Sequence, residues 1–299
     1  MECYLAGATD TSIAGEHPIK NGKAMELYLA GENGKTKAME LYLAGENGKT
    51  KAMELWSFIQ KIKSPLWDNI SILESFFYVS KNKVFPTLLK KGIYKKILLD
   101  SGAFTFMQSS KTNINWEDYI NQYANFINAN DIKLFFELDI DGIIGLDNVE
   151  RLRDRLYRLT GKQPIPVWHI NRGKQYFIDM CKTYPYVALG GIAGAGDKAT
   201  RRNAKKYFPW FINTAHKNNA KIHGLGFTEV KNLKIYHFDS VDSTAWLYGN
   251  RGGYIYRFNT SKCEMEQITK ENSRLKGNLV AIYNFNEWLK FQDYARKYL

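Results

Sequence analysis

Short apolar runs alternate with helical patterns along residues 61–299. Runs rich in Ile, Leu, Val, Phe and Tyr, with polar or turn-forming residues on both sides, are typical of buried strands. Seven of them occur, at Ile70–Tyr78, Lys96–Asp100, Lys133–Asp139, Ile165–His169, Tyr186–Gly190, Lys221–Gly226 and Tyr236–Val241. Strands that alternate with helices in this way predict a sheet of parallel strands.

Helical periodicity fills the segments between several of these runs. The apolar side chains of residues 116–127 recur at three- and four-residue steps, which predicts a helix. Asp147 and Glu150 stand at the capping-box offset and predict the start of a helix that ends before Gly161. Residues 284–299 are amphipathic and predict a last helix on the outside of the domain.

A repeat dominates the N-terminal segment, residues 1–60. Ala24–Lys37 reads AMELYLAGENGKTK, Ala38–Lys51 repeats it without change, and Ala52–Leu55 begins a third copy. Each copy has a short apolar run followed by turn-forming residues, and the opening residues 2–7 are a divergent relative. We expect one YLAG copy to supply the first strand. The other copies are a neutral expansion or a variable loop element near the catalytic face.

With this strand added, the sequence predicts an α/β fold, a (β/α)8 barrel of the TIM type, behind the repetitive segment. Residues 61–299 are expected to form the catalytic domain. In such barrels the functional side chains lie at the carboxyl ends of the strands. The candidates that follow the predicted strands are Asp100, Ser101, Asp139, His169, Gly190, Gly191, His223, Gly224 and Asp239.

Carboxylates and glycines dominate this set. A carboxylate that attacks an anomeric carbon needs a second group to handle the proton of the leaving group, and Asp100 with Asp239 can form such a pair. The pair fits a glycosidase and glycosyl exchange on a nucleoside equally well. Gly190 and Gly191 allow a flat ligand to approach the backbone. An Asp after a strand is also a common helix N-cap, and paired glycines also form tight turns.

Charge adds a basic body to this picture. The net charge is +12, with −2 in residues 1–56 and +14 in residues 57–299. With 14% aromatic residues, this charge favours nucleic acid as a partner, although an excess of surface lysines also explains it. Five basic residues after the fifth run are expected on one helix that contacts phosphates or forms a solvated face: Lys198, Arg201, Arg202, Lys205 and Lys206.

The cysteines are typical of a reducing compartment, and the hydropathy of the chain predicts no membrane span. Cys3, Cys181 and Cys263 are far apart and form neither a disulfide framework nor a C-x-x-C metal motif. No apolar run reaches the roughly 18 residues of a membrane span, and the N-terminus has no secretion signal. We expect no membrane partner and a cytoplasmic location, in the host if a phage encodes the chain.

Four short motifs resemble the tRNA-guanine transglycosylase superfamily, which includes the queuine and archaeosine tRNA-ribosyltransferases. Leu99–Phe104 looks like its D-S-G-G-F motif, and Leu189–Ala193 looks like its G-G-L-A segment. His223–Gly226 looks like its strand-seven segment, and Phe238–Ser240 looks like the F-D-[CS] motif that carries the nucleophile. The motifs occur in family order over about residues 65–250.

This resemblance implies that guanine in a polynucleotide is exchanged for a free 7-deazaguanine base, without a cofactor. By analogy, Asp239 attacks C1′ and forms a covalent intermediate, while Asp100 is the general acid/base. Asp242 and Asp139 are the competing candidates for the nucleophile. The residues implied in substrate binding are Ser101, Phe104, Asp139, His169, Gly190, Gly191, His223 and Gly224.

Three departures from the family favour DNA over tRNA. The tRNA enzymes hold a structural zinc with three Cys and one His near the C-terminus, where this chain has only Cys263, so we expect no metal. Ala103 replaces the second glycine of the first motif. We expect no separate RNA-binding domain after the barrel. A short, zinc-free and basic chain looks more like the phage-type relatives that insert deazaguanines into DNA. A homodimer is compatible with the sequence.

Two other functions fit parts of the pattern. A metal-dependent barrel hydrolase would use His169, His223 and His237 with Asp100 or Asp239, although these histidines have no fixed ligand spacing. A nucleic-acid-binding barrel without catalysis would use the repeats as a recognition surface.

Overall fold

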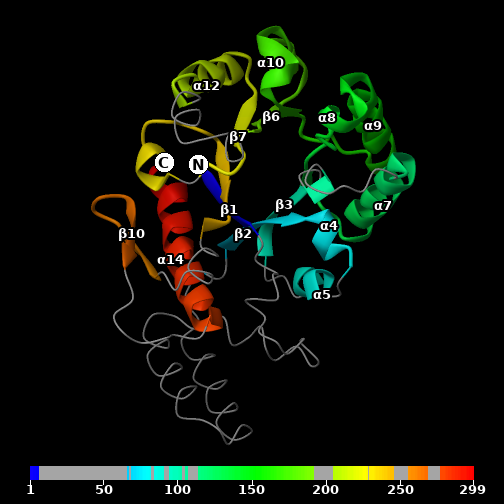
Figure 1. The fold of residues 1–299 in the computed structure, drawn as a ribbon. Coiled ribbons are helices and arrows are strands. Elements are labelled where there is room, and N and C mark those ends of the chain that lie inside the picture. Colours follow the sequence, from blue (N-terminus) through cyan, green and yellow to red (C-terminus); the bar gives the residue numbers. More distant parts are fainter. Residues whose placement is uncertain are drawn as a thin grey trace, which may run out of the picture.

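Eight parallel strands form one curled sheet at the centre of the molecule (Figure 1). The computed structural model describes residues 1–6, 66, 69–81, 84–90, 94–102, 105–106, 114–191, 205–227, 229–245, 255–268 and 277–299. The strands are β1 (Glu2–Ala6), β2 (Ile70–Ser75), β3 (Tyr94–Asp100), β4 (Leu134–Phe135), β5 (Val167–Trp168), β6 (Tyr186–Leu189), β7 (Lys221–Gly224) and β8 (Ser240–Ser243). The identical repeats and the expected boundary at residue 60 lie outside the described residues.

The sheet order follows the chain order and brings β1 beside β8. Reading across the sheet, the order is β4-β3-β2-β1-β8-β7-β6-β5, and each pair of neighbours is parallel. The predicted α/β fold with a parallel sheet is therefore confirmed.

The two edges of the sheet meet at a narrow junction, which we call the seam. Phe136 forms a parallel bridge with Ile165. The Ile165 N–H donates to the carbonyl of Phe135 over 2.9 Å, and the Glu137 N–H donates to the carbonyl of Ile165 over 3.0 Å. This contact joins the β4 side of the sheet to the β5 side, an arrangement compatible with a TIM-type barrel.

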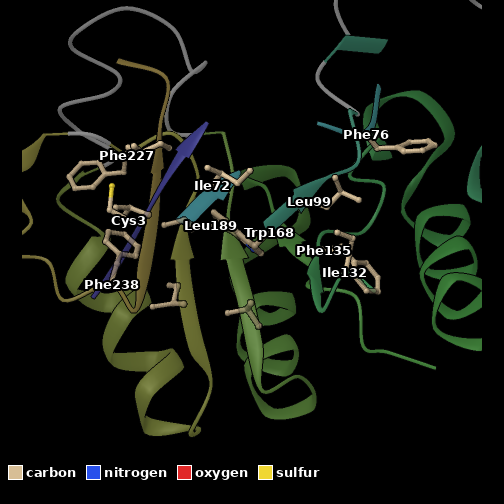
Figure 2. Close-up of a cluster of buried hydrophobic side chains, with 14 of the residues drawn as sticks. Cys3, Ile72, Phe76, Leu99, Ile132, Phe135, Trp168, Leu189, Phe227 and Phe238 are labelled. Carbon is tan, nitrogen blue, oxygen red and sulfur yellow. The ribbon is translucent and has the colours of Figure 1, made fainter. Parts of the chain in front are cut away.

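Side chains alternate between the inside of the curled sheet and an outer layer under the helices, because successive residues of a strand point to opposite faces. The inner cluster takes residues from six strands or their flanks: Tyr4, Leu73, Leu98, Phe136, Ile165, Val167 and Ala188. The outer cluster contains their neighbours, among them Cys3, Ile72, Leu99, Phe135, Trp168 and Leu189 (Figure 2).

Helices cover the outside of the sheet (Figure 1). They are α4 (Phe76–Val79) and α5 (Val84–Lys90) after β2, α7 (Trp116–Ala129) after β3, α8 (Asp141–Ile144) and α9 (Leu146–Thr160) after β4, α10 (Gly173–Thr183) after β5, and α12 (Phe208–Lys217) after β6. The 3-10 turns η3 (Ile170–Arg172) and η4 (Val230–Asn232) follow β5 and β7. The hairpin of β9 (Ile255–Asn259) and β10 (Glu264–Ile268) and the helix α14 (Gly277–Tyr298) follow β8. None of the helices in the described ranges is both long and apolar enough to span a bilayer.

Local signals place α7 and α9 close to where the sequence predicts them. Asn115 caps α7, because its side-chain oxygen accepts from the N–H groups of Glu117 and Asp118. The start of α9 is different, since Gly145 and not Asp147 is the residue before the helix. Asp147 lies within the first turn, where a negative charge interacts favourably with the helix dipole.

The divergent repeat relative at the start of the chain forms β1, and α14 lies against it. The side-chain amide of Gln292 donates to the carbonyls of Cys3 and Ser71, which belong to β1 and β2. Arg296, one helical turn later, forms an ion pair with Glu2 over 2.8 Å. The last helix therefore holds the first strand in the centre of the sheet.

The eighth strand lies later in the chain than its hydrophobic pattern predicts. The predicted run was Tyr236–Val241, whereas β8 covers Ser240–Ser243. Phe238 belongs instead to the outer layer, where its ring lies 5.4 Å from that of Phe208 and 5.7 Å from that of Phe227. The first of the seven predicted runs is also too long, because α4 begins at Phe76.

Candidate active site

Two carboxylates, Asp100 and Asp242, lie on the inside of the curled sheet at the carboxyl ends of the strands, which we call the mouth. Asp100 is the last residue of β3, two positions after the inner Leu98. Asp242 is two positions after Ser240 in β8, and Ser240 contacts the buried His223. Alternation along a strand therefore turns both carboxylates inward. Their charges interact, because the Asp242 charge contributes to the raised pKa of Asp100.

The environment of Asp100 suits a group that exchanges protons. Burial, followed by the nearby negative charge of Asp139, raises the pKa of Asp100 to about 7. The N–H of Gly102 donates to Oδ2 over 2.9 Å and, with the Ser75 hydroxyl, partly opposes this rise. A carboxyl group that titrates near neutral pH can both donate and accept a proton under physiological conditions.

Replacing Asp100 with asparagine is expected to stabilise the protein at pH 8 and to change little at pH 4. Because the pKa of Asp100 rises from 3.8 to about 7 on folding, the folded protein keeps a proton that the unfolded chain releases between these values. The free energy of unfolding of the wild type therefore falls as pH rises through this window. The full shift corresponds to on the order of 4 kcal/mol. Urea unfolding at both pH values measures it, and an equal gain at pH 4 and pH 8 would contradict it.

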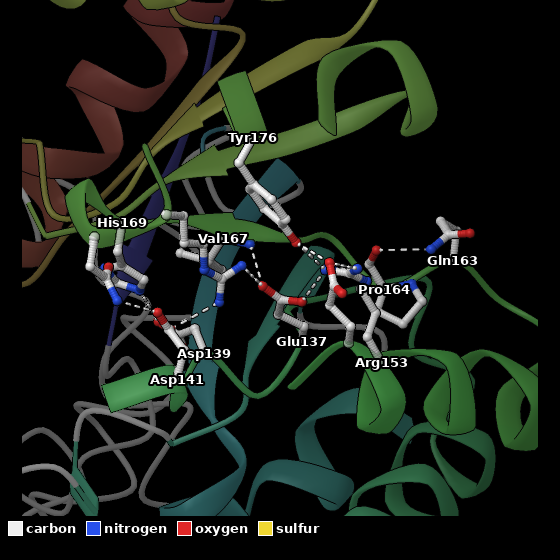
Figure 3. A network of polar contacts seen from close by, with 12 residues as sticks. Glu137, Asp139, Asp141, Arg153, Gln163, Pro164, Val167, His169 and Tyr176 are labelled. Atoms are coloured by element: carbon white, nitrogen blue, oxygen red, sulfur yellow. Dashed lines mark hydrogen bonds and ion pairs between the residues drawn. The ribbon is translucent and has the colours of Figure 1, made fainter. Parts of the chain in front are cut away.

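Asp139 and His169 form a second polar pair at the mouth, as their positions after β4 and β5 led us to expect. Nε2 of His169 lies 3.0 Å from Oδ2 of Asp139 (Figure 3). An ionised carboxylate can only accept, so Nε2 carries the hydrogen in this pair. The side chains of His169 and Asp139 are 20% and 13% exposed, so a polar ligand can reach the pair.

Gly190 is required by the packing of His169. A Cβ atom at Gly190 would lie 2.7 Å from Cε1 of His169 and 2.8 Å from Cγ1 of Val167, so no larger residue fits there. The Gly190 N–H donates to the carbonyl of Trp168 over 2.8 Å, and this donor therefore serves the sheet. Gly191 has a φ of +76°, a conformation that favours glycine.

Asp242 is held through one oxygen only. Oδ1 accepts from the N–H of Gly226 over 2.6 Å and lies 3.2 Å from Nε2 of His223. Within the described part of the chain, Oδ2 receives no hydrogen bond. His223 has no exposed surface and contacts Asp242 from inside the sheet, so it is shielded from a ligand. Gly224 faces the outer layer, where a Cβ atom would lie 3.2 Å from the Phe238 ring.

The segment after Asp100 shapes the pocket through its backbone. Ser101 is buried, and its carbonyl accepts from the hydroxyl of Tyr119 over 2.6 Å. Gly102 has a φ of +84°, and a Cβ there would lie 2.6 Å from Cβ of Phe77. This turn aims the Gly102 N–H at Asp100. Phe104, which the resemblance implies in substrate binding, lies outside the described residues.

Asp239 does not lie at the mouth, and the expectation that it faces a common pocket with Asp100 is wrong. It precedes β8, and its Oδ2 accepts from the N–H of Ile222, the second residue of β7, over 2.8 Å. The same oxygen lies 2.9 Å from Nε2 of His216 in α12. Asp239 is therefore at the amino ends of the strands and on the outer side, under α12. The physical cause is that β8 begins at Ser240, one residue after Asp239. Asp239 therefore lies at the amino end of the strand instead of its carboxyl end, and on the outer face instead of the inner face.

The expected basic cluster is described only in part. Lys198, Arg201 and Arg202 lie outside the described residues. Lys205 forms an ion pair with Glu229, while Lys206 is exposed. Of the two described lysines, Lys206 thus offers its charge to solvent.

The histidines of the metal-dependent alternative lie apart. His169 is at the mouth with Asp139, and His223 is buried under Asp242. His237 is exposed and precedes β8, at the amino ends of the strands. Nowhere in the described ranges do three or more His, Cys, Asp or Glu side chains gather as metal ligands would.

The sequence carried a signal for Asp242 that the motif at Phe238–Ser240 obscured. Ser240 and Asp242 are two positions apart, which places both on one face of a strand, and Gly226 follows β7 at the same end.

No family model matches the chain, and no curated protein matches it either.

Proposed function

We propose that this chain is a transglycosylase of a (β/α)8-barrel type that exchanges guanine in a polynucleotide, DNA rather than tRNA, for a 7-deazaguanine base. Asp242 is the nucleophile and forms the covalent intermediate, and Asp100 is the general acid/base. Asp242 takes the role that the sequence motif gave to Asp239.

One observation carries this assignment: two carboxylates share the mouth in unlike surroundings. Asp100 is partly buried near Asp139, and its pKa of about 7 lets it hold a proton near neutral pH. Oδ1 of Asp242 has two partners, the N–H of Gly226 and Nε2 of His223, while Oδ2 has no donor among the described residues. Unlike surroundings for two neighbouring carboxylates separate an acid from a nucleophile.

The roles follow from the positions of the protons. Oδ2 of Asp242 attacks C1′ of the nucleotide, the bond between C1′ and the guanine nitrogen breaks with its electron pair on the base, and Asp100 gives its proton to that base. In the second step the ring nitrogen of the incoming base attacks C1′ and releases Asp242. The proton of that nitrogen returns to Asp100. The exchange is balanced and requires no oxidant, reductant or further reactant.

A polynucleotide substrate is supported by charge and by the depth of the site. The net charge of +14 in residues 57–299 favours a polyanion. Asp242 is 7% exposed, so a nucleotide reaches it only when turned out of its helix. This costs a few kcal/mol for a paired base. We therefore expect single-stranded substrate to react faster than duplex.

Incorporation of isotopically labelled guanine tests the function directly. Purified protein is incubated with labelled guanine and single-stranded DNA, duplex DNA or tRNA, and the nucleosides are analysed by mass spectrometry. We expect label in DNA, fastest in the single strand, and competition by unlabelled 7-deazaguanine. No label in any polynucleotide would refute the proposal. Release of guanine without incorporation would instead identify a glycosidase that uses the same carboxylates.

A further inference from the structure

A line of polar side chains runs through the inside of the curled sheet and ends at Asp242. It begins at Tyr186, the first residue of β6, whose hydroxyl contacts that of Ser240, the first residue of β8. The Ser240 oxygen lies 2.5 Å from Nδ1 of His223 in β7. Nε2 of His223 lies 3.2 Å from Oδ1 of Asp242. The line thus connects the amino ends of the strands to the mouth.

His223 occupies an apolar setting that only hydrogen bonds at both nitrogens make favourable. It has no exposed surface, and its ring centre lies 5.3 Å from that of Phe136 and 6.1 Å from that of Tyr4. An unpaired polar group inside such a cluster would cost several kcal/mol. Because both nitrogens have partners, the ring is fixed in rotation as well as in position.

The chemistry of the partners sets the direction of each hydrogen bond. An ionised Asp242 can only accept, so Nε2 of His223 donates to it. In the neutral ring Nδ1 is then an acceptor, and it takes the hydrogen of the Ser240 hydroxyl. Ser240 in turn accepts from the hydroxyl of Tyr186. Ser240 and Tyr186 therefore select the tautomer that presents an N–H to Asp242.

Both contacts of Asp242 go to the same oxygen, and this asymmetry fixes the orientation of the carboxylate. The Gly226 N–H and His223 fix Oδ1, while Oδ2 has no donor among the described side chains and backbone groups. With Gly226 alone, the carboxylate could turn about its Cβ–Cγ bond and exchange its two oxygens. Two donors from different positions hold it in one orientation.

We propose that His223 is a positioning residue, held by Ser240 and Tyr186, that orients Asp242 so that Oδ2 is the attacking atom. This role rests on the proposed function, since it presupposes that Asp242 attacks. His223 does not touch the substrate, because it is buried beneath the carboxylate. Its removal should therefore lower kcat and leave KM and polynucleotide affinity near their wild-type values.

Single-turnover formation of the denaturant-stable adduct with an oligonucleotide measures this role. We expect His223→Leu to slow adduct formation by about 10²-fold, since misplacement of a reacting group by about 1 Å has this cost. His223→Gln keeps an N–H near the position of Nε2 and is expected to recover most of the rate. Ser240→Ala, which removes the partner that selects the tautomer, is expected to slow the step by about 10-fold.

His216→Leu is the matched control, because His216 forms a similar pair with Asp239 at the opposite end of the strands, over 2.9 Å. It should leave adduct formation unchanged. A folded His223→Leu that reacts at the wild-type rate would overturn the positioning role. Should that variant not unfold cooperatively, a wild-type rate in Ser240→Ala overturns it. If wild-type protein forms no adduct and no exchange, the proposed function itself fails.

Discussion

Asp242→Asn is expected to abolish the denaturant-stable adduct between the protein and an oligonucleotide and to lower base exchange by at least about 10⁴-fold. Asparagine keeps the shape of the side chain, and its carbonyl can still accept from Gly226 and His223 at the position of Oδ1. Its amide nitrogen replaces the attacking Oδ2 and has no free electron pair for C1′. Binding of the polynucleotide should therefore survive while the chemical step stops.

Asp239→Asn is the matched control for this experiment. The same substitution three positions earlier changes a carboxylate at the amino ends of the strands, where it contacts Ile222 and His216. Adduct formation should stay at the wild-type rate, although thermal stability can fall. Denaturing gels after incubation with oligonucleotide measure both variants. An adduct in Asp242→Asn, or its loss in Asp239→Asn alone, would return the nucleophile to Asp239.

Glu137→Gln is expected to lower the free energy of unfolding by about 3 kcal/mol, because it removes the buried carboxylate that two guanidinium groups share. Arg172 then keeps its ion pair with Asp141, and Arg153 keeps its ion pair with Glu150. Glu137 has no exposed surface. Its Oε2 pairs with Arg153 over 2.8 Å, and its Oε1 pairs with Arg172 over 2.7 Å and accepts from the N–H of Val167 over 2.8 Å. The contacts with Arg172 and Val167 cross the seam, where the two sides also share the backbone bridge between Phe136 and Ile165.

Glu150→Gln is the matched control, because it removes a carboxylate that contacts Arg153 without removing a contact across the seam. Glu150 also contacts Arg153, over 3.4 Å, but its side chain is 40% exposed. A pair this exposed contributes about 0–1 kcal/mol. Urea unfolding of both variants, followed by circular dichroism, gives the comparison. A loss below about 1 kcal/mol in Glu137→Gln would mean that the seam does not depend on this carboxylate.

Most of the fold and part of the site could be predicted because short apolar strands end in polar residues. Asp100 and His169 each follow such a strand, and the order of the strands then places both at one end of the sheet. Gly190 was expected for the approach of a ligand. The structure gives it a different reason, the space needed by the His169 ring.

The eighth strand could not be placed by hydropathy, for a physical reason. Three of its four residues are polar, Ser240, Asp242 and Ser243, and all are buried. The pattern of a buried strand is apolar, so the run at Tyr236–Phe238 resembled the strand more closely. Ser240 and Asp242 are paired by His223 from the neighbouring strand, and this contact cannot be read from a local sequence pattern.

The pairs that hold the seam also depend on tertiary contacts. In the helical pattern of α9, Arg153 resembles an ordinary solvated position, and Arg172 follows β5 in a polar turn. Their side chains are 5% and 0% exposed because both point at Glu137. Single-sequence periodicity shows which face of a helix is apolar, but it does not show which charge has a buried partner.

The central place of β1 has a consequence for synthesis of the chain. Glu2 pairs with Ser240 and Leu5 with Ser243, and α14 binds the carbonyl of Cys3. The ribosome therefore makes this strand long before the strand and the helix that complete its surroundings. During that interval the edge of β1 that faces β8 has unpaired N–H and C=O groups, which are a template for aggregation. Closure is a late, non-local event, so translational arrest before β8 emerges leaves a nascent chain that depends on chaperones.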